Sequence, residues 1–346
     1  MKDLHNFFNI IGKKFNLSGN LLNIKLLQNG GIHKTYQVIY SYPDLTEKYY
    51  IFQKVNPTVF QNPEIIMQNI SLVANYLKNH YPDMQLLEFY QTEQQNYYYK
   101  NFRVMNFIQG ENMRICNSFM QIQQAGKAFG EFHTRLSGLD SKKLKQTIPD
   151  FHNTPNYMQK LNHYKNQNLP ELKILASMQE KACEIFKLYQ TKKLPFRIVH
   201  NDMKCSNLIF YKNQAIIIDW DTIARGMLVY DFGDAVRSFA SKTVSDDLNF
   251  SAIGIDLEKF QAFATGYLQE AKNLTQKEKS VLVQAVFTVT VELATRYLLD
   301  YLQGNRYFKI SYPEHNLIRA RNQIQLAKNI SANANAMQEI ILNILN

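Results

Sequence analysis

The chain has 346 residues, of which 45% are hydrophobic and 13% aromatic, and its formal net charge is +10. This apolar content excludes an intrinsically disordered chain, and the length allows two domains with separate hydrophobic cores. We find no apolar run approaching the roughly 20 residues that span a bilayer, and no long apolar segment typical of a secretory signal. We therefore expect no membrane partner.

The cysteines and the basic residues indicate the cellular location and the class of binding partner. Cys116, Cys183 and Cys205 show no C-x-x-C spacing, which excludes a disulfide framework and favours a reducing, cytoplasmic location. The basic residues are scattered and form only short pairs such as Lys13-Lys14, so we expect no nucleic-acid partner. A basic surface does attract anionic small molecules, nucleotides among them.

The first part of the chain is predicted to form a small mixed lobe. Residues 1–20 are expected to be helical, and residues 21–56 alternate apolar and polar side chains between turn signals, as three hairpin-joined strands do. An amphipathic helix follows over 63–80, and residues 97–110 return to strand and end at a glycine. The expected order is therefore β-β-β-α-β-β.

From Ser118 onward the pattern is mainly helical. We predict one helix over 119–139, two within 154–190 and more from about 256 to 345; a strand (196–200) and a hairpin (207–211 and 214–220) interrupt them. The short segment near Gly110 is the expected boundary. The sequence thus predicts an α+β protein with two domains, 1–108 and 109–346.

The segment IVHNDMKCSNLIFYKNQAIIIDWD (198–221) gathers ionisable and amide side chains in one strand, loop and hairpin. The hairpin is expected to fold back so that Asp219 lies beside Asn207, and carboxylate and amide oxygens suit Mg²⁺. Asp202 is placed to accept the proton of an attacking hydroxyl, and Lys204 to neutralise the transferred phosphoryl charge. The segment therefore predicts metal-assisted phosphoryl transfer.

Each residue of this segment also has a plainer interpretation. Asp202 and Asn207 are residue types that commonly cap loop turns. Asp221 competes with Asp219 for the metal, because residues two apart in a strand share one face. We prefer Asp219 because it ends the apolar run, and expect Asp221 to orient the loop or reach the substrate. Cys205 has no evident His partner that would make it a nucleophile.

The pattern H-x-D-x-x-x-x-N, from His200 to Asn207, followed by a hairpin and an Asp, resembles the catalytic loop of the protein-kinase-like superfamily. It is similar to the variant in aminoglycoside and choline phosphotransferases, with Asn201 where protein kinases carry Arg. The resemblance implies a bilobal protein-kinase-like fold with a small β-rich N-terminal nucleotide-binding lobe and a larger, mainly helical C-terminal catalytic lobe. It implies ATP and Mg²⁺ as cofactors, Asp202 and Lys204 as catalytic residues, and Asn207 and Asp219 as metal ligands.

The resemblance also implies a phosphate-binding cation and a loop that covers the nucleotide. Lys54 is the basic candidate within YYIFQKVN, with Glu64 as its nearest acidic partner. Gly30 and Gly31 fall at a predicted hairpin where backbone N–H groups can approach phosphate, although a plain hairpin turn explains them equally well.

The stretch FRVMNFIQG (102–110) resembles the hinge that receives adenine through the backbone of Met105 to Phe107. An ordinary buried strand would have the same apolar residues.

Several stretches resemble the N-acetylhexosamine 1-kinase branch of this superfamily, among them GGIHKTYQV, IDWDTIARGMLVYDFGDAVR and YFKISYPEHNLIRAR. That resemblance implies transfer of the ATP γ-phosphate to the anomeric hydroxyl of an amino sugar, GlcNAc or GalNAc. It implies that Arg296 and Tyr307 line the sugar pocket, although Arg296 is also spaced to pair with Asp300 on one helix face. Gly31, His33 and Lys34 occupy a loop where relatives in this branch often carry other polar residues. This difference weakens the prediction of the substrate.

Two other functions stay open at this point. One is a kinase for another hydroxyl acceptor, such as an aminoglycoside, a choline-like amino alcohol or a different sugar. The other is a non-catalytic nucleotide-binding module. The tripeptide Asp231-Phe232-Gly233 matches a kinase metal signature, but it lies much farther from Asp202 than Asp219 does. We expect Asp231 to cap helix N–H groups or to brace the catalytic loop.

Overall fold

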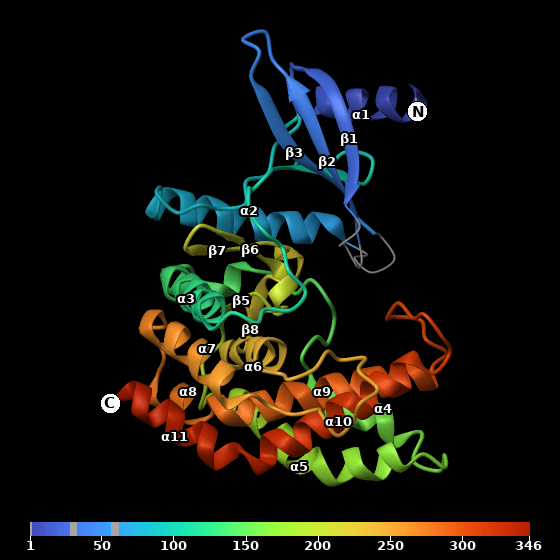
Figure 1. The fold of residues 1–346 in the computed structure, drawn as a ribbon, viewed down its shortest axis with the longest axis vertical. Coiled ribbons are helices and arrows are strands. Elements are labelled where there is room, and N and C mark those ends of the chain that lie inside the picture. The colour runs from blue at the N-terminus through green and yellow to red at the C-terminus, as the bar shows by residue number, and fades with distance from the viewer. Residues whose placement is uncertain (1, 28–32, 57–61) are drawn as a thin grey trace. The chain divides into compact units, whose positions relative to one another are not determined.

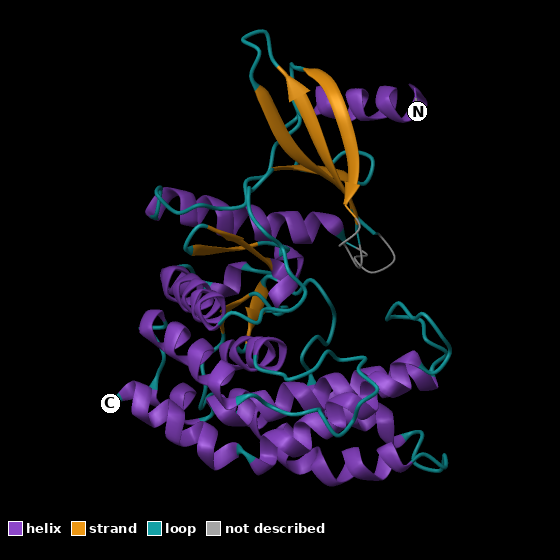
Figure 2. Ribbon diagram, viewed as in Figure 1, coloured by secondary structure: helices purple, strands orange, loops and turns teal. Residues whose placement is uncertain are grey.

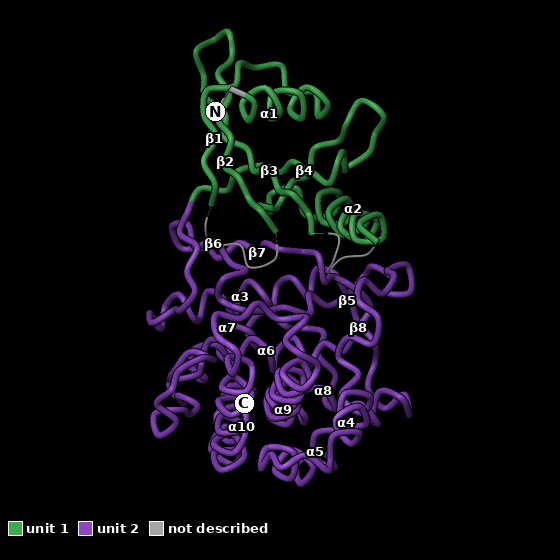
Figure 3. Tube along the Cα trace, turned by 90° about the vertical axis from the view of Figure 1, so that its right-hand side faces the viewer, with its two compact units in different colours: residues 1–109 green, residues 110–346 purple. Residues whose placement is uncertain are grey.

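The computed structural model describes residues 2–27, 33–56 and 62–346 (Figure 1). The chain divides into two compact units, Met1–Gln109 and Gly110–Asn346 (Figure 3). The first unit is rich in strands and the second in helices, as the colouring by secondary structure shows (Figure 2). The α+β class with a small β-rich part and a larger helical part, predicted from the sequence, is confirmed.

The first unit contains a four-stranded antiparallel sheet in the order β1-β2-β3-β4. Its strands are β1 (Asn20–Leu27), β2 (Lys34–Ser41), β3 (Glu47–Lys54) and β4 (Phe102–Asn106). Helix α1 (Lys2–Lys14) places Phe8 and Ile11 in one buried cluster with Val38, Phe52 and Val104 of the sheet. Alternate strand residues face the same side, so this cluster defines the α1 face of the sheet.

Helix α2 (Pro63–His80) begins where the sequence predicts, because Asn62 caps it by accepting a hydrogen bond from the Ile65 backbone nitrogen at 3.3 Å. The strand expected over 97–110 is shorter than predicted. Lys100 and Asn101 adopt left-handed backbone angles, with φ of 47° and 65°, and only β4 joins the sheet. The order in this unit is therefore β-β-β-α-β rather than β-β-β-α-β-β.

Helices form most of the second unit. They are α3 (Phe119–Arg135), α4 (Thr154–Asn162), α5 (Pro170–Gln190), α6 (Leu228–Phe239), α7 (Leu257–Glu270), α8 (Gln276–Ser280), α9 (Leu282–Leu302), α10 (His315–Ala332) and α11 (Ala334–Leu345). Helices α3 and α7 cross with their backbones nearly touching. A Cβ atom at Gly126 would collide with the backbone oxygen of Phe263, and one at Gly266 with that of Gln123. Glycine at both positions therefore permits this close approach.

Helix α9 is the core helix of the second unit. By length and composition it is the one helix among the described residues that qualifies as a membrane span, which corrects the sequence-based expectation that no apolar run approaches this length, and 78% of its apolar window is buried inside the protein. Core helices of globular proteins pass the same test because they are apolar on every side.

Two short sheets bracket the predicted catalytic loop. Strand β5 (Arg197–Val199) pairs with β8 (Ala224–Gly226), and β6 (Leu208–Tyr211) forms the predicted hairpin with β7 (Gln214–Ile217). The pairing of β5 with β8 was not predicted from the sequence. It matters because β5 leads into the loop and β8 leads directly into α6, so this pairing fixes the start of α6 beside the loop.

Candidate active site

The loop between β5 and β6 brings three of the predicted site residues into direct contact. The Lys204 ammonium group lies 2.6 Å from Oδ2 of Asp202. The Asn207 amide nitrogen donates to the same Oδ2 at 2.9 Å and to the Asp202 backbone oxygen at 2.8 Å. The Asp202 side chain is still 30% exposed, which leaves the carboxylate accessible to a small molecule.

These contacts set the charges of Asp202 and Lys204. Burial acts to raise the pKa of Asp202, but the Lys204 charge and the hydrogen bonds from Lys204 and Asn207 outweigh it, so the pKa is lowered. Burial acts to lower the pKa of Lys204, but the Asp202 and Asp219 charges raise it above its usual value. Both groups are therefore ionised at neutral pH.

The end of the β6–β7 hairpin brings oxygen donors together. The Ile218 backbone nitrogen donates to the Asn207 backbone oxygen at 2.9 Å, which places Asp219 next to the loop. Asp219 has left-handed backbone angles, φ 61° and ψ 62°, and one carboxylate oxygen of Asp219 lies within 4.8 Å of one of Asp221. Carboxylate and amide oxygens are hard donors, so the residues present fit Mg²⁺.

Asp231, of the D-F-G tripeptide, braces the catalytic loop. Its carboxylate accepts hydrogen bonds from the backbone nitrogens of His200 at 2.6 Å and Asn201 at 2.7 Å, and lies 3.0 Å from Nε2 of His133. The bracing role, one of the two that the sequence suggested, is confirmed. The residue lies within the first turn of α6 and its side chain is fully buried, so it holds the loop and does not face a ligand.

Sequence reasoning missed an ion pair one turn farther along α6. Arg237 contacts Oδ1 of Asp234 at 2.7 Å and 2.9 Å, and both side chains are 14% exposed. The Asp234 charge also contributes to the raised pKa of Lys204, and the Asp202 charge to that of Arg237. The only signal in the sequence was the i,i+3 spacing of the two residues.

The profile of the "Phosphotransferase enzyme family" matches residues 27–263, more than half of the chain. The chain belongs to this family. Solved structures extend the likeness to nearly the full length of this phosphotransferase. An amicoumacin kinase in complex with AMP-PNP, Ca²⁺ and Ami is 14% identical, with a TM-score of 0.61 and 92% of each chain covered.

Two more structures share the fold. A spectinomycin phosphotransferase with ADP and spectinomycin is 16% identical, with a TM-score of 0.58 over 94% of this chain and 98% of that one. A choline kinase from Streptococcus pneumoniae is 12% identical, with a TM-score of 0.57 over 94% and 99%. At these identities the likeness shows the fold, which is the kinase-like architecture expected from the catalytic loop.

Arg296 and Tyr307 of the phosphotransferase come together as a second group within the same unit. The Arg296 guanidinium carbon lies 5.7 Å from the centre of the Tyr307 ring, and Phe151, Tyr157 and Phe308 surround it at 4.9, 5.7 and 5.5 Å. Burial acts to lower the pKa of Arg296, but neighbouring Tyr157, Tyr307 and Glu292 raise it. The result is a half-buried cation in contact with four aromatic rings, of which that of Tyr307 is exposed.

Asp300 does not serve as the partner of Arg296. Its carboxylate accepts hydrogen bonds from the backbone nitrogens of Arg306, Tyr307 and Phe308 at 2.8, 2.8 and 2.9 Å, and from Asn316 at 2.9 Å. The i,i+4 spacing of Arg296 and Asp300 therefore does not reflect an ion pair between them. Asp300 holds the loop that delivers Tyr307 to the Arg296 side chain.

In the first unit, Lys54 is the last residue of β3 and is exposed, on the face that carries Phe52. The opposite face carries Gln53, which accepts hydrogen bonds from the buried Arg103 at 2.9 Å and 2.5 Å. Sequence reasoning did not single out Arg103. Among the described residues, no ion pair joins Lys54 to Glu64, which is exposed on α2.

The proposed hinge lies along β4 and just beyond it. Met105 is buried and pairs with Ile51 of β3. The backbone nitrogen of Phe107 donates to Tyr49 at 3.3 Å, so this donor has a partner within the unit. Gly30 and Gly31 lie outside the described residues.

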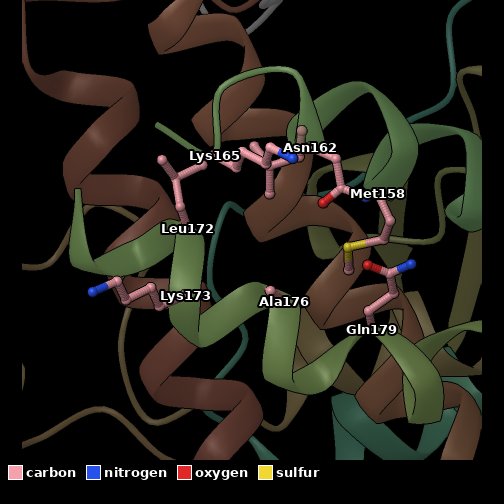
Figure 4. Close-up of a pocket in the computed structure, with 8 residues that line it drawn as sticks. Met158, Asn162, Lys165, Leu172, Lys173, Ala176 and Gln179 are labelled. Carbon is pink, nitrogen blue, oxygen red and sulfur yellow. The ribbon is translucent and has the colours of Figure 1, made fainter. Parts of the chain in front are cut away.

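A pocket of about 100 Å³ lies between α4 and α5 (Figure 4). Its lining includes the apolar side chains of Met158, Leu161 and Leu172 and the basic residues Lys165 and Lys173. No residue predicted for the site of the phosphotransferase lines this pocket. The pocket therefore adds nothing to the chemistry of the catalytic loop.

Proposed function

We propose that this phosphotransferase moves the γ-phosphate of ATP to the anomeric hydroxyl of an N-acetylhexosamine, GlcNAc or GalNAc, to give a sugar 1-phosphate. The observation that carries the proposal is the hydrogen-bonded set of Asp202, Lys204 and Asn207 beside Asp219. A partly exposed, ionised carboxylate next to a cation and to oxygen donors is the arrangement that phosphoryl transfer requires.

In this proposal the residues of the loop divide the chemistry between them. Asp202, with its lowered pKa, accepts a hydrogen bond from the acceptor hydroxyl and orients it. It receives the hydroxyl proton as the new oxygen–phosphorus bond forms and the bond from the γ-phosphorus to the bridging oxygen breaks, which releases ADP. Lys204 keeps its proton and places a fixed positive charge beside the reacting oxygens. Most of the rate enhancement then comes from positioning and from charge neutralisation.

Asn207 and Asp219 are the proposed Mg²⁺ ligands. The nitrogen of the Asn207 amide is used in the bonds to Asp202, so the amide oxygen is the atom that would bind the metal. Asp221, close to Asp219, is proposed to orient the loop or to reach the substrate. When bound, Mg²⁺ neutralises charge on the phosphate oxygens.

The nucleotide is proposed to bind the first unit. Lys54 is the proposed partner of the phosphates, because its exposed position at the end of β3 leaves the ammonium group accessible. Gly30 and Gly31 would cover the phosphates, and the backbone from Met105 to Phe107 would receive the adenine. Two of the similar structures hold AMP-PNP or ADP, which supports an adenine nucleotide.

The surroundings of Arg296 favour a neutral, hydroxylated acceptor over a cationic one. Aromatic rings that recognise an ammonium ligand must be open to it. Here the rings around Arg296, Tyr307 among them, already contact the protein's own guanidinium. A positively charged choline or aminoglycoside would meet a like charge, whereas sugar hydroxyl and acetamido oxygens accept hydrogen bonds from a guanidinium.

The second candidate is a kinase for a different hydroxylated acceptor. It is favoured by the fold of amicoumacin, spectinomycin and choline kinases, to which this chain is similar.

One experiment tests both candidates. The protein is incubated with Mg-ATP and, in separate reactions, GlcNAc, GalNAc, glucose, choline and kanamycin, and ADP release is followed. We expect release with the hexosamines and a product that has lost its reducing end, because phosphate on the anomeric oxygen blocks ring opening. Turnover of choline or kanamycin with none of the sugars would favour the second candidate.

Asp202→Asn is the matched control for this experiment. It keeps the size of the side chain and removes the charge, so turnover on the best acceptor should fall by about 100-fold or more. Wild-type turnover in Asp202→Asn would refute the assignment of the base.

A further inference from the structure

A buried histidine connects the catalytic loop with the helix that carries Arg296. His152 belongs to the segment 150–153, here called the bridging loop, which immediately precedes α4. Its Nδ1 lies 2.9 Å from Oε1 of Glu292 on α9, and its Nε2 lies 3.4 Å from the backbone oxygen of Asn201. Asn201 immediately precedes Asp202. The imidazole therefore spans the space between α9 and the base of the catalytic loop.

The chemistry of its two partners determines the protonation state of His152. A backbone carbonyl can only accept a hydrogen bond, and so can an ionised carboxylate. Burial acts to raise the pKa of Glu292, but His152, Arg296 and a hydrogen bond from Thr154 outweigh it, so the pKa is lowered and the carboxylate is ionised. Both ring nitrogens of His152 must then donate, and only the imidazolium form carries both protons.

The other charges around His152 are consistent with a cation. Burial and the Arg296 charge act to lower the pKa of His152, but the charges of Glu292 and Asp234 and the hydrogen bond to Glu292 raise it above the usual 6.5. Tyr230 of α6 packs its ring against the imidazole at 5.4 Å, nearly perpendicular. The Tyr230 hydroxyl lies 3.0 Å from that of Thr154, which in turn donates to Oε2 of Glu292 at 2.5 Å.

The bridging loop is also tied to the aromatic group around Arg296. The Phe151 ring lies 4.9 Å from the Arg296 guanidinium, and the next residue is His152. Asp150 and His152 both have a left-handed φ of 57°. Such angles cost free energy in residues other than glycine, and they persist only where surrounding contacts impose them. The hydrogen bonds of His152 are contacts of that kind.

We propose that His152, as an imidazolium, is a positioning residue. It keeps the backbone before Asp202 at a fixed position relative to the proposed acceptor site at Arg296. This inference rests on the proposed role of Asp202 in phosphoryl transfer. It implies an alkaline limit to catalysis. Below its raised folded-state pKa, His152 donates to both partners. Above that pKa one ring proton remains, and it stays on Nδ1 beside the closer Glu292 carboxylate, so the bond from Nε2 to Asn201 is lost. The turnover number should fall over the same range.

Two variants separate the two hydrogen bonds of His152. In His152→Asn the amide nitrogen takes the place of Nδ1, which keeps a donor for Glu292 and removes the one for Asn201. In His152→Gln the amide nitrogen takes the place of Nε2, which keeps the donor for Asn201. We expect kcat to fall about tenfold in His152→Asn and less in His152→Gln, with the KM for ATP unchanged in both. Neither variant should show the alkaline limb of the wild type.

His163→Gln is the matched control, because His163 is exposed at the end of α4 and should behave as wild type. A purely structural role for His152 would lower the melting temperature of both variants and leave the shape of the pH profile unchanged. Variants that keep wild-type kcat and the wild-type alkaline limb would overturn the proposal.

A spectroscopic measurement on the wild-type protein does not depend on turnover. Nitrogen-15 NMR of the imidazoles, assigned with His152→Gln, should show both ring nitrogens of His152 protonated at pH 7. In Glu292→Gln the His152 pKa should move downward. A neutral His152 at pH 6 would overturn the proposal even in an active enzyme. Turnover of an acceptor other than a hexosamine would refute the proposed substrate, and the kinetic test of His152 would proceed with that acceptor.

Discussion

Replacing Asp231 by Asn is the sharpest test of its bracing role. The carboxylate accepts hydrogen bonds from the nitrogens of His200 and Asn201 on separate oxygens. In Asp231→Asn one oxygen becomes an NH₂ group that faces an N–H donor. One charge-assisted hydrogen bond, about 1.5–3 kcal/mol, is lost, and the buried N–H left without an acceptor costs about 1–3 kcal/mol more. We therefore expect a loss of about 3 kcal/mol or more in the free energy of unfolding.

Thermal unfolding followed by circular dichroism measures this loss. For a unit of this size, about 3 kcal/mol corresponds to a melting temperature lower by roughly 6–12 °C. Asp140→Asn is the control, because Asp140 is an exposed cap in the same unit and Asn caps equally well. An unchanged melting temperature together with lost turnover would refute the reasoning, because it would indicate that Asp231 acts on the substrate or on the metal.

Three further predictions concern the site itself. In Lys204→Met the Asp202 carboxylate loses the charge that lowers its pKa, so the acid limb of kcat/KM should move to higher pH; an unmoved limb would argue against their coupling. Asp219→Asn should raise the Mg²⁺ concentration for half-maximal ADP release at least about tenfold, and an unchanged metal dependence would exclude Asp219 as a ligand. Arg296→Lys, which replaces a planar guanidinium by a point charge, should raise the KM for the acceptor by about tenfold and leave the KM for ATP unchanged. Equal effects on both KM values would contradict an acceptor role.

The sequence was informative wherever the site depends on residues close together in the chain. Asp202, Lys204 and Asn207 lie in one short loop, so their spacing alone brings them into contact once the flanking strands form. The hairpin that returns Asp219 to Asn207 is equally local, because β6 and β7 are joined by a tight turn. Such contacts need no knowledge of the tertiary fold.

Contacts between distant segments could not be predicted in this way. His152 and Glu292 are 140 residues apart, and nothing in either local sequence indicates that they meet. Helical spacing even suggested a wrong partner for Asp300, because the spacing of residues on one helix does not reveal which loop packs beside it. The long strand expected before Gly110 failed for another reason: left-handed angles at the polar pair Lys100 and Asn101 turn the chain between Tyr99 and Phe102.

The position of the loop that carries Asp202 depends on the glycines at the distant α3–α7 crossing. His133 of α3 lies 2.8 Å from the Tyr267 hydroxyl of α7 and, through its other nitrogen, 3.0 Å from Asp231. The distance between α3 and α7 therefore determines where His133 holds Asp231, and Asp231 in turn holds the loop. An alanine at Gly126 or Gly266 would act as a wedge, and the misalignment it causes would be transmitted to Asp202 although neither glycine touches a reactant.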